Sequence, residues 1–244
     1  MFGPERNRCN TASSGIGHTL DPVTLDNSTE ADPEPETEPD EIHPLLGPYS
    51  DVGQRLIQAT IDVMDADGEV AVRVQDIVAA VGVQAPVLYR NFGSREGLVQ
   101  AAQAIRLQRD MDAEGERFSS AVASANTAEH FTELLDALIA GVATPTRRAM
   151  RWKRVNVIGS TYSRPELAAA VAQLQRRTVA RIAEAFRPAQ QRGWIRADLD
   201  LAAFAAWFAG QTLGRILIEL GDTDVDDETW NALSALAIRH LLLG

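Results

Sequence analysis

Residues 74–98 read VQDIVAAVGVQAPVLYRNFGSREGL, and this stretch decides the fold. Its apolar residues recur at helical spacing on both sides of Val81-Gly82-Val83, which predicts two short helices joined by a tight turn. Gly82 follows the first apolar face, where a glycine can end a helix in the left-handed conformation without steric cost. Pro86 falls in the first turn of the second helix, where its missing N–H does no harm.

Two helices this short cannot bury their apolar faces alone, so we expect a third helix to pack across them. The segment from Leu56 to Met64 has apolar residues at the required spacing, within a helix expected from about Asp51 to Asp65. After Gly93, Ser94 can cap a further helix that begins at Arg95. The pattern therefore predicts a three-helix unit that contains a helix-turn-helix.

The same residues resemble the DNA-binding domain of the tetracycline-repressor (TetR) family of bacterial transcription regulators. The resemblance covers about a fifth of the chain, and its most specific part is the continuation Leu-Tyr-x-x-Phe-x-Ser-Arg-Glu-x-Leu. The residues that carry it are Asp76-Ile77, Ala80-Val81-Gly82-Val83, Pro86, Leu88-Tyr89, Asn91-Phe92, Ser94-Arg95-Glu96 and Leu98.

A helix-turn-helix places its second helix in the major groove of DNA. By resemblance, the positions that face the groove are Gln84, Ala85, Pro86, Val87, Tyr89, Arg90 and Asn91. Gln84 can pair with adenine. Asn91 can do the same, although its position more often meets phosphate. The apolar run Ala85-Pro86-Val87 departs from the family and can pack on thymine methyl groups. We assign Tyr89, Arg90 and Arg95 to phosphates, with a rim position in the small core as the alternative for Tyr89.

The start of the second helix also departs from the family, which usually has threonine or serine there. This chain has Val72-Arg73, so the hydroxyl cap is lost, at a cost of about 1 kcal/mol. Arg73 can replace the hydroxyl group's phosphate contact by its charge. We assign Leu88 and Phe92 to the core.

The charge of the chain is distributed unevenly. The formal net charge is −11, and residues 1–48 contain ten acids but only two arginines. Residues 49–100 contain seven acids and four arginines, which argues against DNA binding because phosphate neutralisation supplies most non-specific affinity. Between Ala79 and Arg95, however, there are two arginines and no acid.

Residues 1–48 have no apolar periodicity and include the run DPEPETEPDE, so we expect a disordered acidic tail. The simpler interpretation is a solubilising tail. The alternative is that the tail competes with DNA phosphate for Arg73, Arg90 and Arg95.

Helical patterns fill the rest of the chain, and no strand or internal repeat is evident. We expect an all-α fold: a disordered tail at 1–48, an N-terminal helix-turn-helix DNA-binding domain at 49–96, and a helical effector-binding and dimerisation domain at 97–244. The later helices are expected at about 97–118, 126–143, 145–161, 165–191, 198–220 and 226–242, with Ser163 as the cap of the fourth of these.

The last two helices are candidates for a dimer interface. Residues 202–210 are apolar all round, which predicts burial on more than one side; polar residues within 201–220 favour a buried helix over a membrane span. The resemblance implies that the chain dimerises through these helices as a four-helix bundle, and the alternative is internal packing alone. The interface positions are Trp207, Gly210, Gly214, Trp230, Leu233, Leu236, Ala237, His240 and Leu241.

An effector pocket is expected among the helices of residues 126–210, for a small molecule that is largely apolar. Its candidate lining residues, each of which also suits a plain core position, are Phe131, Met150, Trp152, Tyr162, Phe186 and Phe208. The basic run from Arg147 to Arg154 has five charges in eight residues. It is interpreted as a solvated face, with an acidic effector or the acids of residues 62–69 as alternative partners.

The sequence gives no sign of an enzyme, a metal site or a cofactor. His18 and His43 lie in the expected tail, His130 and His240 stand alone, and there is no glycine-rich phosphate loop or G-x-S-x-G motif. A single cysteine and no visible secretory signal suit the cytoplasm. The expected function is therefore a homodimeric repressor that binds a pseudo-palindromic DNA operator and is released by a small molecule. The alternative is a helical ligand-binding or protein-interaction module that no longer binds DNA.

Overall fold

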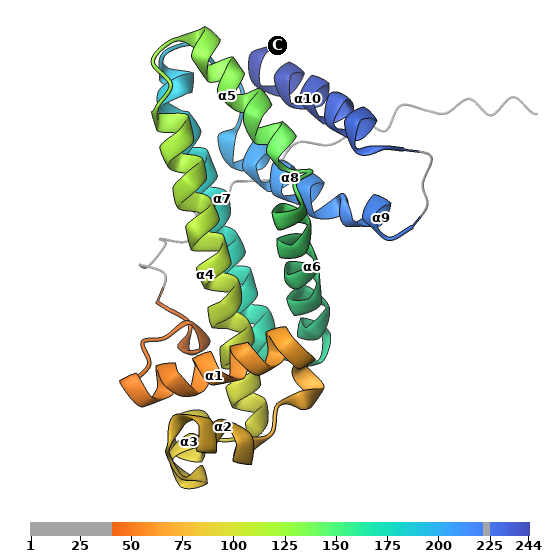
Figure 1. Ribbon diagram of the computed structural model, residues 1–244. Coiled ribbons are helices and arrows are strands. Elements are labelled where there is room, and N and C mark those ends of the chain that lie inside the picture. Colours follow the sequence, from red (N-terminus) through yellow and green to blue (C-terminus); the bar gives the residue numbers. More distant parts are fainter. Residues whose placement is uncertain (1–40, 222–224) are drawn as a thin grey trace, which may run out of the picture. The chain divides into compact units, whose positions relative to one another are not determined.

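The computed structural model describes residues 41–221 and 225–244, which are helical and contain no strand (Figure 1). This confirms the all-α fold class. The predictions for residues 1–40, including competition between the acidic tail and DNA, lie outside the described residues. The helices are α1 (Asp51–Asp67), α2 (Val74–Val81), α3 (Ala85–Phe92), α4 (Arg95–Ala123), α5 (Ala128–Gly141), α6 (Pro145–Ser160), α7 (Pro165–Gln191), α8 (Leu201–Gly214), α9 (Ile216–Glu219) and α10 (Asp227–Leu243), with short 3-10 turns η1 (Pro44–Leu46), η2 (Glu69–Ala71) and η3 (Thr161–Ser163).

Helices α1 to α3 form the predicted three-helix unit. Gly82 ends α2 in the left-handed conformation, with φ 74° and ψ 35°, and the hydroxyl of Ser94 accepts a hydrogen bond from the Gly97 N–H at the start of α4. Arg73 precedes α2 without a side-chain cap, as its sequence predicts. Leu56, Leu88 and Leu98 are fully buried in the shared core, because each helix turns its apolar face inward.

Residues 41–48 belong to the folded body, although they were expected to be part of a disordered tail. Residues 41–48 include η1, whose Leu46 is buried in one cluster with Leu107 and Leu167. The His43 N–H donates a hydrogen bond to the Gln173 side chain (2.9 Å), so His43 is part of the folded body. Acidic composition ends at Glu41, and the apolar leucines that follow find a surface on α4 and α7.

The long helices α4 and α7 lie side by side, and α5, α6 and α8 pack around them (Figure 1). Phe186 on α7 is at the centre of the larger core, with ring centroids 5.3 Å from Phe118, 6.1 Å from Phe131 and 5.8 Å from Phe204. Aromatic side chains bury large areas, so this cluster joins α4, α5, α7 and α8 into one core.

Two expected helix boundaries are wrong. Ser163 lies within η3 and does not cap α7; the residue before α7 is Arg164, which has no side-chain cap. The helix expected from 198 to 220 ends at Gly214, and α9 follows as a separate helix. Arg215 at the break is fully buried and pairs with Asp227 and Glu219. The break follows because an arginine in this apolar stretch must meet carboxylates to be buried.

Candidate functional site

Helix α3 presents most of its predicted DNA-contacting residues to solvent. Gln84, Pro86, Tyr89, Arg90 and Asn91 are exposed, whereas Ala85 and Val87 are half-buried. Leu88 holds the opposite face in the core, so the helix is fixed by one side and open on the other. The side chains of Arg90 and Arg73 form no ion pair or hydrogen bond with the described part of the chain, so both guanidinium groups are available to an anion.

Two of the predicted contacts are engaged inside the protein. The Arg95 guanidinium donates hydrogen bonds to the backbone carbonyls of Val72 and Glu69, both at 2.8 Å. It therefore ties the connection before α2 to α4, and our assignment of Arg95 to phosphate is at odds with this use. Asn91 donates to the Val87 carbonyl (2.7 Å) and its Oδ1 accepts from the Ser50 hydroxyl (3.2 Å), which joins α3 to the start of α1.

Three of the seven acids that argued against DNA binding, Asp65, Glu69 and Glu96, form ion pairs with the helical body. Asp65 accepts from Lys153 on α6 (3.0 Å) and Arg106 on α4 (2.7 Å). Burial raises the pKa of Asp65, but these hydrogen bonds outweigh it and lower the pKa overall. The pairing of Lys153 with Asp65 confirms one alternative for the basic run, namely contact with the acids of residues 62–69.

Glu69 and Glu96 are neutralised in the same way by a single residue. Arg164, between η3 and α7, pairs with Glu69 and lies 2.6 Å from Glu96 Oε1. The hydrogen bonds from Arg164 lower the pKa of Glu69 against the effect of burial, with a smaller contribution from Gln103. The formal charge of residues 49–100 therefore overstates the negative charge near α3.

A cavity of about 100 Å³ lies among α4, α5, α6, α7 and α8. The predicted lining residues Met150 and Phe208 contribute to it. It is also lined by four arginines, Arg147, Arg151, Arg154 and Arg181. The sequence prediction missed them because it considered only apolar side chains as lining residues. Arg147, Arg151 and Arg154 recur at helical spacing and form the inward face of α6, whereas Arg148 and Lys153 of the same run are exposed.

The other four residues predicted for the pocket lie elsewhere. Phe131 and Phe186 are core residues that are 1% and 2% exposed. Trp152 is exposed, because it follows the buried Arg151 and so points away from the inward face of α6. Tyr162 is 99% exposed because α6 ends at Ser160 and Tyr162 lies on the turn η3.

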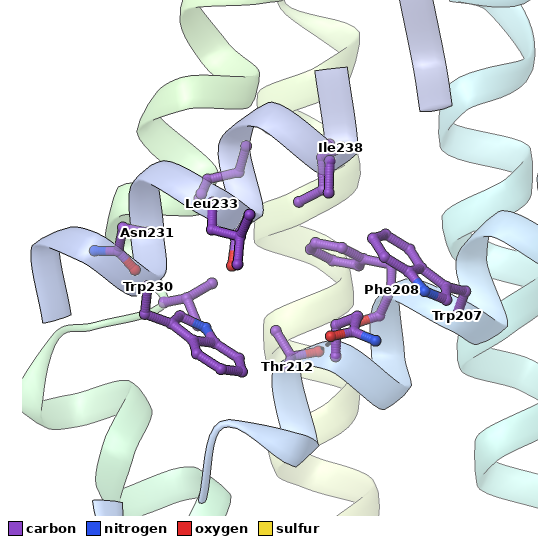
Figure 2. Close-up of a pocket in the computed structure, with 12 residues that line it drawn as sticks. Trp207, Phe208, Thr212, Trp230, Asn231, Leu233 and Ile238 are labelled. Atoms are coloured by element: carbon purple, nitrogen blue, oxygen red, sulfur yellow. Dashed lines mark hydrogen bonds between the residues drawn. The ribbon is translucent and has the colours of Figure 1, made fainter. Parts of the chain in front are cut away.

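A second cavity, of about 290 Å³, lies among α5, α8 and α10, and Figure 2 shows it between side chains of α8 and α10. Trp207 and Phe208 come from α8, and Trp230, Leu233 and Ile238 come from α10. Four of the residues predicted for the dimer interface therefore line a cavity in the single chain: Trp207, Trp230, Leu233 and Ala237.

The remaining predicted interface residues are mostly exposed. Gly210, Leu236 and His240 are exposed, Gly214 is half-buried, and Leu241 packs against the main core. A Cβ atom added at Gly210 or Gly214 would meet no other atom within 4 Å, so packing within one chain does not require glycine at either position. Within residues 41–221 and 225–244, no group of three or more His, Cys, Asp or Glu side chains is placed to hold a metal ion.

Comparison with known proteins identifies the N-terminal unit. Residues 56–102 match the family model for bacterial regulatory proteins of the tetR family. No curated protein matches the sequence.

Solved structures share the fold of the whole helical body. A TetR-family transcriptional regulator from Pectobacterium atrosepticum has a TM-score of 0.53 and 21% identity, and covers 79% of this chain and 94% of its own. A protein from Rhodococcus sp. that is assigned to the same family has a TM-score of 0.55 and 21% identity. The match covers 80% of this chain and 100% of the other. A protein from Saccharomonospora viridis, described as a transcriptional regulator and solved in complex with choline, has a TM-score of 0.56 and 18% identity. The match covers 80% of this chain and 98% of the other.

At these identities the solved structures show the fold, and the family model adds the specific domain. Its matched residues coincide with the three-helix unit whose α3 is held by one face and exposed on the other. Residues 56–102 therefore form a domain that matches the tetR-family model, and the helical body that carries it shares the fold of solved TetR-family transcriptional regulators.

Proposed function

We propose that this chain is a homodimeric repressor that binds a pseudo-palindromic DNA operator through α3 and is released by a small molecule. In this proposal residues 49–96 bind DNA, and residues 97–244 hold the effector and form the dimer. A regulator of this kind works in the cytoplasm.

The observation that carries the DNA-binding proposal is the free outer face of α3. Arg90 and Arg73 are exposed and have no partner within the described residues, so their charge is available for phosphate. Gln84 is exposed at the N-terminus of α3, and this end of a recognition helix meets base edges. Gln84 can therefore read adenine through two hydrogen bonds.

The homodimer is supported by apolar surface that one chain leaves uncovered. The segment Leu201–Glu219 is long and apolar enough to cross a membrane by composition, yet only 28% of its most apolar window is buried. On α10, Leu233 and Leu236 are 63% and 67% exposed. Exposed apolar patches of this kind mark interaction surfaces, and a second copy of the chain can cover both helices at once.

Binding of a dimer to DNA sets the spacing of its two α3 helices. Its two α3 helices must lie about 34–36 Å apart to enter successive major grooves on one side of the duplex. A small molecule that binds more tightly to a conformation with another spacing shifts the population away from DNA. The cavity among α4 to α8 supports this part of the proposal because it lies in the body from which α4 leads to α3.

The test is a gel shift with DNA from upstream of the chain's own gene and with a shuffled duplex of equal length. We expect retention of the first duplex only. Gln84→Ala should reduce the preference for the native site by about tenfold, since one good bidentate base contact contributes about 1–3 kcal/mol of discrimination. Gln175→Ala, an exposed glutamine on α7, is the matched control.

The competing function is a ligand-binding module that has lost DNA binding. The apolar run Ala85-Pro86-Val87 on α3 is the observation that favours it. If no duplex is retained at low salt while small molecules still bind the helical body, the competing function holds.

A further inference from the structure

The cavity among α4 to α8 has more arginines than carboxylates on its walls. Arg147, Arg151, Arg154 and Arg181 line it, against Glu114 alone. Glu114 is shared, because it pairs with Arg147 and accepts from Arg154 at 2.9 Å. Two guanidinium groups therefore divide one negative charge at the wall of the cavity.

Arg151 is also incompletely neutralised. Arg151 is 6% exposed and pairs with Glu219, but its buried Nε–H has no hydrogen-bond partner. Glu219 is itself shared with Arg215 on α8–α9. An unpaired buried donor costs free energy that an added acceptor recovers.

The chain also makes room for the fourth arginine. Gly115 is buried in the middle of α4, and a Cβ atom there would lie 2.6 Å from Cδ of Arg181. A glycine inside a helix costs about 1 kcal/mol relative to alanine, so packing of Arg181 against α4 accounts for it. Arg181 also donates to Asp112 at 2.7 Å, which fixes it beside the cavity.

The remaining wall is mainly apolar and the space is small. Phe118, Leu138, Ile182 and Phe208 lie on it, so a ligand must offer an apolar body as well as a charge. A volume of about 100 Å³ is below the ~150 Å³ that holds a benzene ring, which limits the body to a few carbon atoms.

We propose that this cavity binds a short-chain organic monocarboxylate, with its carboxylate among Arg147, Arg151 and Arg154 and its carbon chain against Phe118 and Leu138. This names the chemical class of the effector and rests on the proposed function for its regulatory consequence. It refines the expectation of a largely apolar effector. Burial and the neighbouring Arg154 and Arg151 lower the pKa of Arg147, and burial lowers that of Arg154, so an anion would relieve repulsion between these arginines.

The test is isothermal titration calorimetry of the full chain at pH 7 with propionate and butyrate. Butyramide is the neutral isostere, butylammonium the cation and sulfate the anion without a carbon chain. We expect binding of the two carboxylates and at least tenfold weaker binding of the other three. Butyramide lacks the charge, butylammonium is repelled by the arginines, and sulfate has no carbon chain to bury against the apolar wall.

Variants separate a ligand contact from a purely structural role. Arg147→Gln and Arg154→Gln should weaken butyrate binding by about tenfold, since each removes one charged donor. Arg117→Gln is the matched control, because Arg117 is an exposed arginine on α4 that does not line the cavity. Glu114→Gln should tighten butyrate binding by about threefold or more, since it frees two arginines; a structural role for Glu114 gives no such gain. If an arginine variant fails to fold, Glu114→Gln still decides the matter.

The outcomes are distinguishable from those of the proposed function. If the carboxylates bind in this pattern but leave operator affinity unchanged, the ligand assignment stands and release by an effector is wrong. If the chain binds its operator but butyramide or sulfate binds as well as butyrate, or Glu114→Gln fails to strengthen binding, the ligand assignment is overturned and DNA binding is unaffected.

Discussion

Arg90 on α3 and Arg95 at the start of α4 allow a quantitative test of how this protein binds DNA. Arg90 is exposed on α3 without a partner in the described residues, whereas Arg95 donates to two backbone carbonyls. We predict that Arg90→Gln removes one phosphate contact per subunit. In a dimer that is two contacts, and each contributes about 0.9 to the slope of log K against log salt concentration.

The expected change in the salt slope is therefore about 1.8. Between 50 and 200 mM salt, the ratio of wild-type to Arg90→Gln affinity should fall by about tenfold. Fluorescence anisotropy with a labelled operator duplex, measured at four or more salt concentrations, gives the slope directly. The sequence preference should remain unchanged, because phosphate contacts carry no direct sequence information.

Arg95→Gln is the matched comparison, since it removes the same charge from the same unit. It breaks two partly buried hydrogen bonds, so we expect a loss of about 1–3 kcal/mol in the free energy of unfolding and little change in slope. A slope that falls by about 1.8 in Arg95→Gln and stays constant in Arg90→Gln would refute the assignment of the two residues.

Three further predictions concern the dimer, the core and the pH dependence of stability. Leu236→Arg should convert the dimer into a monomer in sedimentation velocity, while Ile42→Arg, an exposed apolar residue outside α8 to α10, should not; two unchanged dimers would place the interface elsewhere. Phe186→Ala should reduce the free energy of unfolding by about 3–5 kcal/mol in urea denaturation, because it empties the centre of the aromatic cluster; a loss below about 1 kcal/mol would mean that the cluster is loosely packed. The lowered pKa of Glu69 adds stability above the ordinary carboxyl pKa of 4.5, which is lost as the pH falls through the lowered value. Glu69→Gln should therefore flatten the fall in unfolding free energy between about pH 6 and pH 3, and equal curves for both proteins would contradict this role.

Local sequence signals were sufficient to predict the ends of the helices that bind DNA in this proposal. Gly82, Pro86 and Ser94 act on the backbone within one turn of their own positions, so their effect on helix ends could be predicted without tertiary structure. The same holds for Thr127, Thr144 and Asp226, which cap α5, α6 and α10 through their side-chain oxygens.

The cavity could not be predicted in this way, because apolar character is a poor guide to a charged wall. Aromatic residues were expected to line it, yet Phe131 and Phe186 form the core and Tyr162 faces solvent. The arginines of α6 were interpreted as a solvated face because nothing in their own segment offers a carboxylate. Their partners Glu114 and Glu219 lie 33 or more residues away in sequence and meet them only after folding.

The sequence by itself determined the helix-turn-helix, the all-α class and most helix ends, since each depends on residues within a few positions of one another. Tertiary structure alone decided which charged side chains are paired within the protein. Asp65, Glu69 and Glu96 are neutralised from α4, α6 and the start of α7, Arg95 is bonded to backbone carbonyls, and Arg90 is left free. The reason is that an ion pair depends on the distance between two groups in space, which the order of residues does not specify.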